Sequence, residues 1–131
     1  MKSARVNAIY ISIMRQPWCF AVCRKLQSGH HNFELFKPSS LPDLLSVLFT
    51  LLNSECPDFV ARLDSLDNER MEKSSHRTVR YFDAHYAPNW RQCFPDTIGR
   101  NEARAIAGLA CAAARVGKYS INLSLKSVLD S

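Results

Sequence analysis

Residues 4–25 read ARVNAIYISIMRQPWCFAVCRK, and this stretch decides the fold. Its first part, Ala4–Ile13, alternates between two faces and is rich in β-branched side chains, which favours a strand. Pro17 cannot donate a hydrogen bond to a partner strand and restricts the residue before it, so a turn is expected there. Trp18–Lys25 fits a second strand. The stretch therefore predicts an antiparallel hairpin.

The elements that follow the hairpin are predicted from the same kinds of pattern. Asn32–Phe36 alternates again and is expected to add a third antiparallel strand. Ser40 is a helix N-cap with an acidic residue three positions later, and the leucines after it repeat at helical spacing to about Asn53. Asn101–Val116 has an interior of mostly alanine, which makes it the clearest helix, and Gly117 is expected to stop it.

The rest of the chain is predicted to complete a mixed sheet. Phe59–Leu63 and Thr78–Phe82 fit a fourth and a fifth strand, and residues 64–75 between them fit a polar loop or a short exposed helix. Residues 84–100 contain three breakers and are assigned no structure. Tyr119–Leu129 fits one more strand or a loose arm. The whole chain is thus expected to be a single α/β domain with a mixed five-stranded sheet, an N-terminal antiparallel three-stranded meander and flanking helices.

The composition is that of an ordinary globular domain. The chain has 131 residues, 47% hydrophobic and 22% charged, and this length can bury a core without metal or disulfide staples. Its longest apolar stretches are about half of the roughly 20 residues that a membrane span needs, so no membrane partner is expected. The five cysteines have irregular spacing. They are interpreted as buried reduced thiols, which suits a cytoplasmic protein.

The net charge of +5 is unevenly distributed along the chain. Residues 1–38 contain six basic residues and one acidic residue. Residues 39–71 reverse this with two basic and six acidic residues, and residues 72–131 contain nine basic and five acidic residues. A basic excess permits contact with nucleic acid, although scattered Lys and Arg side chains also serve simply to keep a surface hydrated.

Three short motifs occur along the chain in an order and spacing that can be compared with known families. Residues 6–12 (VNAIYIS), followed by Pro17-Trp18, fit a first strand, a turn and an aromatic opening of the second strand. Pro57–Ala61 (PDFVA) fits the start of a fourth strand, and Asn101–Ala107 (NEARAIA) fits a last helix rich in small residues. With the meander, these motifs resemble the RNase H-like fold, and within it the RuvC-type Holliday-junction resolvases. For an active member the resemblance implies metal-dependent cleavage of nucleic acid.

The departures from the family pattern fall on its chemistry. Such nucleases hold two divalent metals with converging carboxylates. The positions that carry these carboxylates in the family are here Tyr10, Leu63, Asn101 and Arg104. The resemblance therefore implies a degenerate active site without metal or cofactor. In this fold the Arg104 guanidinium would point to the place of the metal and could hold a phosphate, unless Arg104 is a solvated helix residue. His30 and His31 beside Gly29 are interpreted as a solvated turn.

The best candidates for exposed contacts mix cations with aromatic rings between Arg77 and Arg91. Such mixtures stack on bases and bind phosphates, and they are also typical of protein–protein hot spots. The alternative is that Tyr81, Phe82 and Trp90 pack in the core. The residues predicted to bind nucleic acid or a protein partner are Arg77, Arg80, Tyr86, Trp90, Arg91, Arg100 and Arg104.

The sequence thus predicts a catalytically inactive RNase H-like binding or adaptor module. Its expected partner is nucleic acid or a protein complex that processes nucleic acid. One alternative is an enzyme, a divalent-metal-dependent nuclease that uses relocated acids such as Asp64 and Glu102. Another is a small accessory or inhibitor protein, of a bacterial or phage type, that binds a larger complex without touching nucleic acid. Salt-dependent binding would separate the first interpretation from the third.

Overall fold

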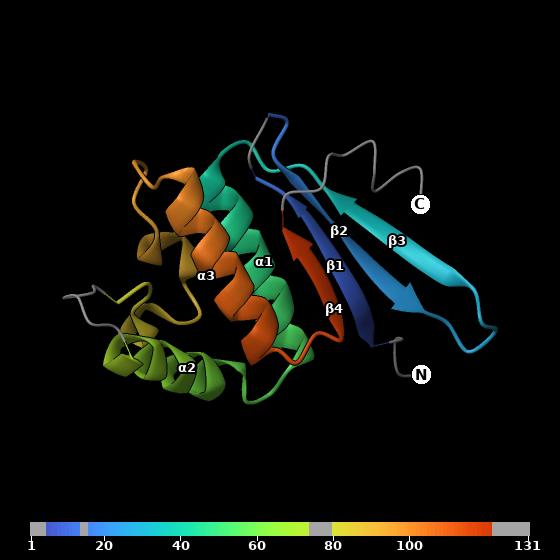
Figure 1. The fold of residues 1–131 in the computed structure, drawn as a ribbon. Coiled ribbons are helices and arrows are strands. Elements are labelled where there is room, and N and C mark those ends of the chain that lie inside the picture. Colours follow the sequence, from blue (N-terminus) through green and yellow to red (C-terminus); the bar gives the residue numbers. More distant parts are fainter. Residues whose placement is uncertain (1–4, 14–15, 74–79, 122–131) are drawn as a thin grey trace.

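The structure is built on a four-stranded sheet with helices on one of its two faces (Figure 1). It is a computed structural model, which describes residues 5–13, 16–73 and 80–121. The elements along the chain are β1 (Val6–Ser12), β2 (Cys19–Lys25), β3 (His31–Phe36), α1 (Leu41–Glu55), α2 (Phe59–Lys73), the 3₁₀ helices η1 (Ala84–Tyr86) and η2 (Trp90–Cys93), α3 (Arg100–Ala113) and β4 (Lys118–Ile121).

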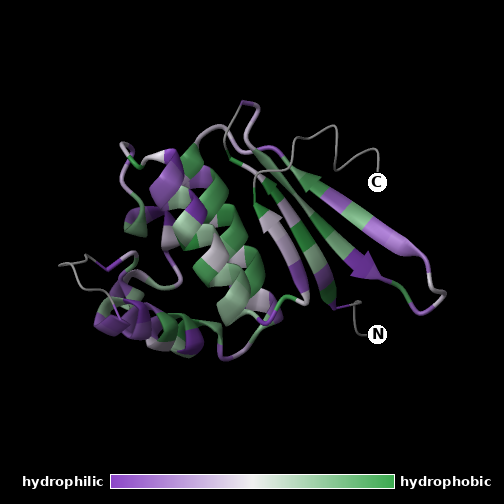
Figure 2. Ribbon diagram, in the orientation of Figure 1, coloured by the Kyte–Doolittle hydropathy of each residue, from purple (hydrophilic) through white to green (hydrophobic). Residues whose placement is uncertain are grey.

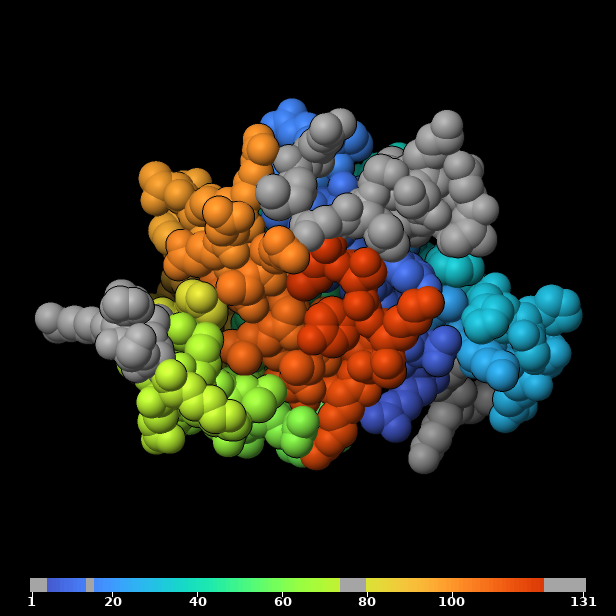
Figure 3. All heavy atoms as spheres, in the orientation of Figure 1, coloured from blue at the N-terminus to red at the C-terminus, as the bar shows by residue number. Residues whose placement is uncertain are grey.

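The strands lie in the order β3-β2-β1-β4. β2 is antiparallel to both β1 and β3, whereas β4 is parallel to β1. A parallel neighbour needs a crossover connection, and the helices between β3 and β4 provide it. The predicted α/β class and the antiparallel three-stranded meander are confirmed. The described residues form four strands and not the predicted five. In the space-filling view the β2–β3 hairpin stands out at the side of the molecule (Figure 3).

The expectation of a fourth strand over Phe59–Leu63 is wrong, because these residues begin helix α2. Phe59, Leu63 and Asp67 are buried, and their spacing of four residues is that of one helix face. The short apolar run fits a strand when taken alone. The helical period becomes visible only when the polar residues up to Lys73 are included, since they supply the exposed face of α2.

The segment predicted as a fifth strand, Thr78–Phe82, is described only from Arg80 onward, and that part is irregular. It is held against α2 by Asp67, which is fully buried. The amide of Tyr81 donates to the Asp67 carboxylate at 3.3 Å, and Arg70 donates to it from two nitrogens at 3.0 and 2.9 Å. The Arg70 guanidinium also lies 3.7 Å from the centre of the Tyr81 ring. One buried carboxylate therefore fixes a connection that has no regular hydrogen bonding of its own.

The core lies between the helices and the face of the sheet that carries Ile9, Ile11, Phe20 and Val22, which we call the inner face. In Figure 2 the hydrophobic residues follow β1, β2 and α1, and hydrophilic residues cover much of α2. An aromatic cluster fills the space between α1, α2 and η2. The ring of Phe49 meets the rings of Phe59, Trp90 and Phe94 edge-on, with ring centres 5.0–5.6 Å apart. These contacts order residues 84–100, for which the sequence predicted no structure.

Helices α1 and α3, the two long helices that the sequence predicted, lie close to the predicted positions. The Ser40 hydroxyl accepts the amide of Asp43 at 3.2 Å, as the capping pattern predicts. α3 ends earlier than expected, because Arg115 and not Gly117 takes the left-handed conformation, with φ of 56°. The amide of Arg115 donates to Ala112 and the next amide to Cys111, both at 3.1 Å, which is the hydrogen-bond pattern of a Schellman motif.

The Arg115 side chain forms contacts that hold this residue in its left-handed backbone conformation. Its guanidinium donates two hydrogen bonds to Asp58, at 3.0 and 3.1 Å, and the Cys56 thiol donates to Asp58 at 3.0 Å. The hydrogen bonds from Cys56 and then from Arg115 lower the pKa of Asp58 from 3.8 to about 2. This cluster joins the end of α1 to the end of α3, beside the start of α2.

Replacing Asp67 with Ala is expected to lower the free energy of unfolding by about 2–3 kcal/mol, because the Tyr81 amide and the Arg70 guanidinium lose a buried acceptor. Urea denaturation measures this change. Glu69→Ala on the same helix is the matched control, since Glu69 forms only an exposed pair with Lys73 and its loss should cost less than about 0.5 kcal/mol. Equal effects of the two substitutions would contradict the assigned role of Asp67.

The stability difference between the wild type and Asp58→Asn is expected to depend on pH. Because folding lowers the pKa of Asp58, its contribution is complete above the ordinary value of 3.8 and is lost as the pH falls through about 2. Urea denaturation of both proteins between neutral pH and pH 2 tests this. A difference that stays constant across this range would show that Asp58 does not titrate in the described contact.

Candidate nucleic-acid interface

The sheet face opposite the helices, which we call the outer face, carries no acidic side chain among the described residues. Successive side chains of a strand point to opposite faces, so the neighbours of Ile9 and Ile11 point outward. The register assigns to this face Ala8, Tyr10 and Ser12 on β1, Cys19, Ala21, Cys23 and Lys25 on β2, His31, Phe33 and Leu35 on β3, and Lys118 and Ser120 on β4.

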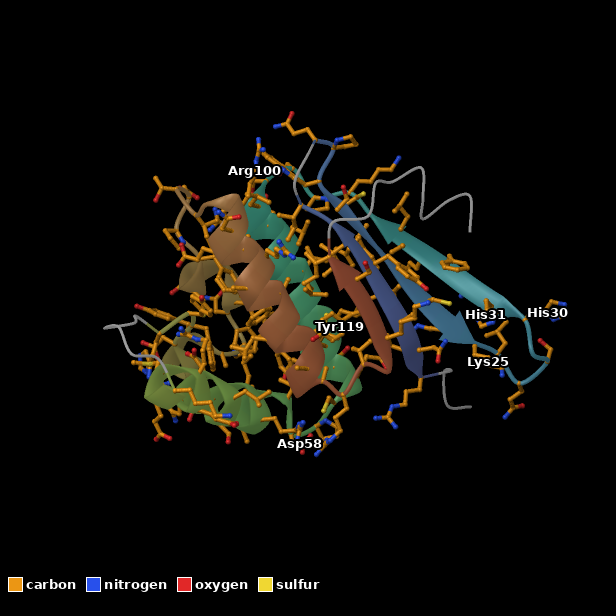
Figure 4. The ribbon with its side chains drawn as sticks, in the orientation of Figure 1. Lys25, His30, His31, Asp58, Arg100 and Tyr119 are labelled. Atoms are coloured by element: carbon orange, nitrogen blue, oxygen red, sulfur yellow. The ribbon has the colours of Figure 1, made fainter. Side chains whose placement is uncertain are left out.

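Basic side chains gather at one end of this sheet. Lys25 ends β2 and pairs with His31, which begins β3. Lys118 begins β4, and Arg5 directly precedes β1. In Figure 4, Lys25, His30 and His31 lie together at the free end of the β2–β3 hairpin. We call this group of residues the basic end, and it consists of Arg5, Lys25, His30, His31 and Lys118.

The turn between β2 and β3 places the two histidines. The amide of Leu26 donates to the carbonyl of His30 at 2.8 Å, and the amide of Gly29 donates back to Leu26 at 2.9 Å. Gly29 has φ of 89°, a conformation that side chains with a Cβ rarely adopt, so the turn depends on glycine. Nδ1 of His31 lies 3.5 Å from the Cys23 thiol. The histidines are therefore held on the hairpin and do not belong to a loose loop.

An exposed aromatic ring lies next to these charges. Phe33 is 48% exposed on the outer face, and its strand partner Cys23 is only 3% exposed. Leu35 is 36% exposed, and Tyr10 is partly buried near the middle of the sheet. An exposed ring beside cations can stack on a base while the cations contact phosphates.

The cations of the basic end lie close together and have no acidic partner among the described residues, whereas Lys37, Arg62 and Arg104, which also form no ion pair, lie apart, after β3, on α2 and on α3. Among the described residues, the side chains of Arg5, Lys25 and Lys118 form no ion pair. The neighbouring Arg24 points to the inner face and binds Glu55 of α1. In the helical layer the ion pairs are Arg70–Asp67, Lys73–Glu69, Arg80–Asp64, Arg91–Asp43, Arg91–Asp96 and Arg115–Asp58.

Three of the predicted contact residues have structural partners. Arg80 donates to Asp64 at 2.8 Å and also binds Asn68. Arg91 donates to Asp43 at 3.0 Å, binds Asp96 and donates to the carbonyl of Phe94 at 2.8 Å, so it ties η2 to the start of α1. The third residue, Trp90, is 1% exposed in the aromatic cluster, as in the core alternative considered from the sequence.

The other predicted contact residues are distributed over separate surfaces. Tyr86 is 39% exposed on η1. Arg100 and Arg104 are exposed in the first turns of α3, and Figure 4 shows Arg100 well apart from the hairpin end. Arg77 lies outside the described residues. The structure therefore does not bring the six described residues of this set together in one interface.

The positions of the degenerate active site do not converge either. Tyr10 lies between Ile9 and Ile11 and so points to the outer face. Leu63 is fully buried in the helical layer on the other side of the sheet. Asn101 and Arg104 are exposed on α3. The four side chains therefore lie in three separate places: the outer face of the sheet, the core of the helical layer and the exposed surface of α3.

The relocated acids proposed from the sequence lie on different helices. Asp64 on α2 binds Arg80 and lines a cavity of about 480 Å³ together with Asp83, Tyr86 and Cys93. Glu102 is exposed in the first turn of α3 and does not line this cavity. No group of three or more His, Cys, Asp or Glu residues with metal-binding geometry occurs in the part of the chain that the structure describes.

The cysteines offer no ready nucleophile. All five are free thiols, and burial raises the pKa of each, to about 12 for Cys111. A raised pKa keeps a thiol protonated at neutral pH, whereas thiol chemistry needs the thiolate. None of the five cysteines is therefore an activated thiol.

Comparisons with known proteins identify no relative: no family model, no curated protein and no solved structure matches this chain. Within residues 5–13, 16–73 and 80–121, no single helix is long and apolar enough to cross a membrane. The pair α1 and α2 reaches that length and composition only when taken together, and the two helices are bent by 120°.

The sequence did not single out the basic end. The excess of six basic residues over one acidic residue in residues 1–38 was its only signal. Lys118 lies almost a hundred positions away along the chain and joins this group only because β4 pairs with β1. The pairing of Lys25 with His31 likewise follows from the hairpin register.

Proposed function

We propose that this chain is a nucleic-acid-binding module that holds a single strand at the basic end of its sheet. One observation carries the proposal. Arg5, Lys25 and Lys118 have no carboxylate partner in the described part of the chain, and they lie near the exposed ring of Phe33. The arginines of the helical layer, in contrast, are mostly neutralised by aspartates. Cations without counter-charges favour a polyanionic partner.

A single strand fits this surface better than a duplex. The unstacked bases of a single strand are free to stack on an exposed side chain such as Phe33. Its phosphates can contact Lys25 on β2 and Lys118 on β4, on the same face of the sheet. Lys118 and Phe33 belong to the same row of paired residues across the four strands, through Ala8 and Cys23. This row aligns the stacking site with a phosphate site, and Ala8 and Cys23 between them are buried.

We also propose an RNase H-like ancestry without catalysis. The antiparallel meander that opens the domain supports the ancestry. The four family positions lack carboxylates, which supports the absence of catalysis, but they do not converge in the structure. The motif Pro57–Ala61 gives no support, because it leads into helix α2 and not into a strand. Asp64, the acid most suited to a relocated nuclease site, is bound to Arg80. Binding is therefore the proposed activity, and cleavage is not.

The double substitution Lys25→Ala with Lys118→Ala is expected to weaken binding of a labelled oligothymidylate in a fluorescence-anisotropy titration. The logarithm of the binding constant should also fall less steeply with the logarithm of salt concentration, by about 1.4, because each phosphate contact on a single strand contributes about 0.7. The matched control is Lys37→Ala with Lys73→Ala, which removes the same charge at two exposed positions away from the basic end.

Each outcome of this titration has a clear meaning. Equal weakening by both double substitutions would show that only net charge matters and would contradict the proposed site. Loss of binding on Arg100→Ala with Arg104→Ala, and not on the lysine substitutions, would place the site at the start of α3. Absence of binding by the wild type would overturn the proposal, and cleavage of the oligonucleotide with Mg²⁺ would favour the nuclease alternative.

A further inference from the structure

β3 is an edge strand with one free side. In the order β3-β2-β1-β4 it pairs only with β2, and all of its residues except the last are exposed. Its exposed side chains include two large apolar ones, Phe33 and Leu35. The space-filling view shows this hairpin standing out from the body of the molecule (Figure 3).

The hairpin turn determines which backbone groups of β3 lie on the free side. Leu26 and His30 form a hydrogen-bonded pair, since the Leu26 amide donates to the His30 carbonyl at 2.8 Å. Hydrogen-bonded and non-hydrogen-bonded pairs alternate along an antiparallel ladder. The backbone groups of the even-numbered residues 32, 34 and 36 therefore point to β2. Those of His31, Phe33 and Leu35 point to the free edge.

Within residues 5–13, 16–73 and 80–121, this edge carries few of the features that usually prevent a strand from pairing with another chain. Such features are proline, lysine, a bulge, an inward-pointing charge or a covering segment. The six residues of β3 contain no proline and no lysine, and its pairing with β2 is regular along its whole length. Glu34 is the only carboxylate on the strand. An edge of this kind is a template for a further strand.

We propose that a second copy of this chain pairs with this edge, antiparallel, about a two-fold axis that passes through Phe33. In this register Phe33 lies opposite Phe33 of the second copy. His31 lies opposite Leu35 of the second copy, and Asn32 lies opposite its Glu34. The three amides and three carbonyls that each copy presents on its free edge are then all paired. The two Phe33 rings also meet on the outer face, and an aromatic cross-strand pair stabilises a sheet.

Charge selects this register over its neighbours. Moving the two-fold axis from Phe33 to Glu34, which is the next register with paired edge groups, places Glu34 opposite Glu34 of the second copy. Like charges directly opposite each other destabilise a sheet. A shift in the other direction leaves Leu35 opposite the turn at Gly29. In the proposed register Glu34, the only acidic residue among residues 1–38, lies opposite Asn32 of the second copy, whose strand partner is Arg24. The acid of each edge thus faces a neutral side chain of the other copy and not a second carboxylate.

The size of the contact predicts a weak dimer. Stable interfaces bury about 1,600 Å² in total, and a pair of six-residue edges with two exposed apolar side chains each supplies less. Association is therefore expected to depend on protein concentration. The two outer faces would lie on the same side of one continuous sheet.

Analytical ultracentrifugation of the full chain without nucleic acid tests the proposal. Asn32→Glu places two Glu–Glu pairs across the axis and is expected to raise the dissociation constant of the dimer by about tenfold. Combining Asn32→Glu with Glu34→Asn exchanges the two partners and should restore the wild-type value to within about twofold. Asn101→Glu, the same change at an exposed position of α3, is the matched control and should have no effect.

Hydrogen exchange gives a second readout on the same protein. The amides of His31, Phe33 and Leu35 should become more protected as the protein concentration rises. A monomer at every concentration would overturn the dimer, and a dimer that the exchanged pair does not restore would overturn the register. Because no nucleic acid is present, failure here leaves the proposed binding function intact, and failure of the binding experiment leaves the dimer intact.

Discussion

The packing of helices against only one face of the sheet is the constraint on which the rest of the structure depends. Ile9, Ile11, Phe20 and Val22 on the inner face meet the apolar sides of α1 and α3 in one core. Each strand alternates, so this burial also fixes which residues remain on the outer face. The register leaves small or apolar side chains in the middle of that face and cations at one end.

The charged residues of the chain perform two different tasks. In the helical layer, arginines and aspartates hold irregular connections in place: Arg91 ties η2 to α1, and Asp67 ties the segment at Tyr81 to α2. At the basic end, Lys25 and Lys118 hold nothing together in the described structure. A net charge of +5 alone could not show this division, because paired and unpaired cations contribute equally to it.

Sequence patterns predicted the elements whose signals are local. The hairpin and meander, the Ser40 cap of α1 and the alanine-rich helix α3 depend on neighbouring residues and were found close to their true positions. The first five residues of α2 were predicted as a strand because taken alone they resemble one, whereas the exposed helix considered for residues 64–75 matches the rest of α2. The core position of Trp90 was one of two alternatives from the sequence, but the partners of Arg80 and Arg91 could not be predicted, since Asp64 and Asp43 lie far away in the sequence. The basic end was missed for the same reason, because strand pairing assembles it.

The central claim is that the unneutralised end of the sheet, and not the helical layer, contacts nucleic acid. A titration of the ¹⁵N-labelled protein with a short oligothymidylate, followed by two-dimensional NMR, tests it most directly. The account predicts that the largest shift changes occur at the amides of Lys25, His31, Phe33 and Lys118, with α2 and α3 unchanged. Shift changes concentrated at Arg100–Arg104, or around the cavity at Asp64 and Tyr86, would contradict it.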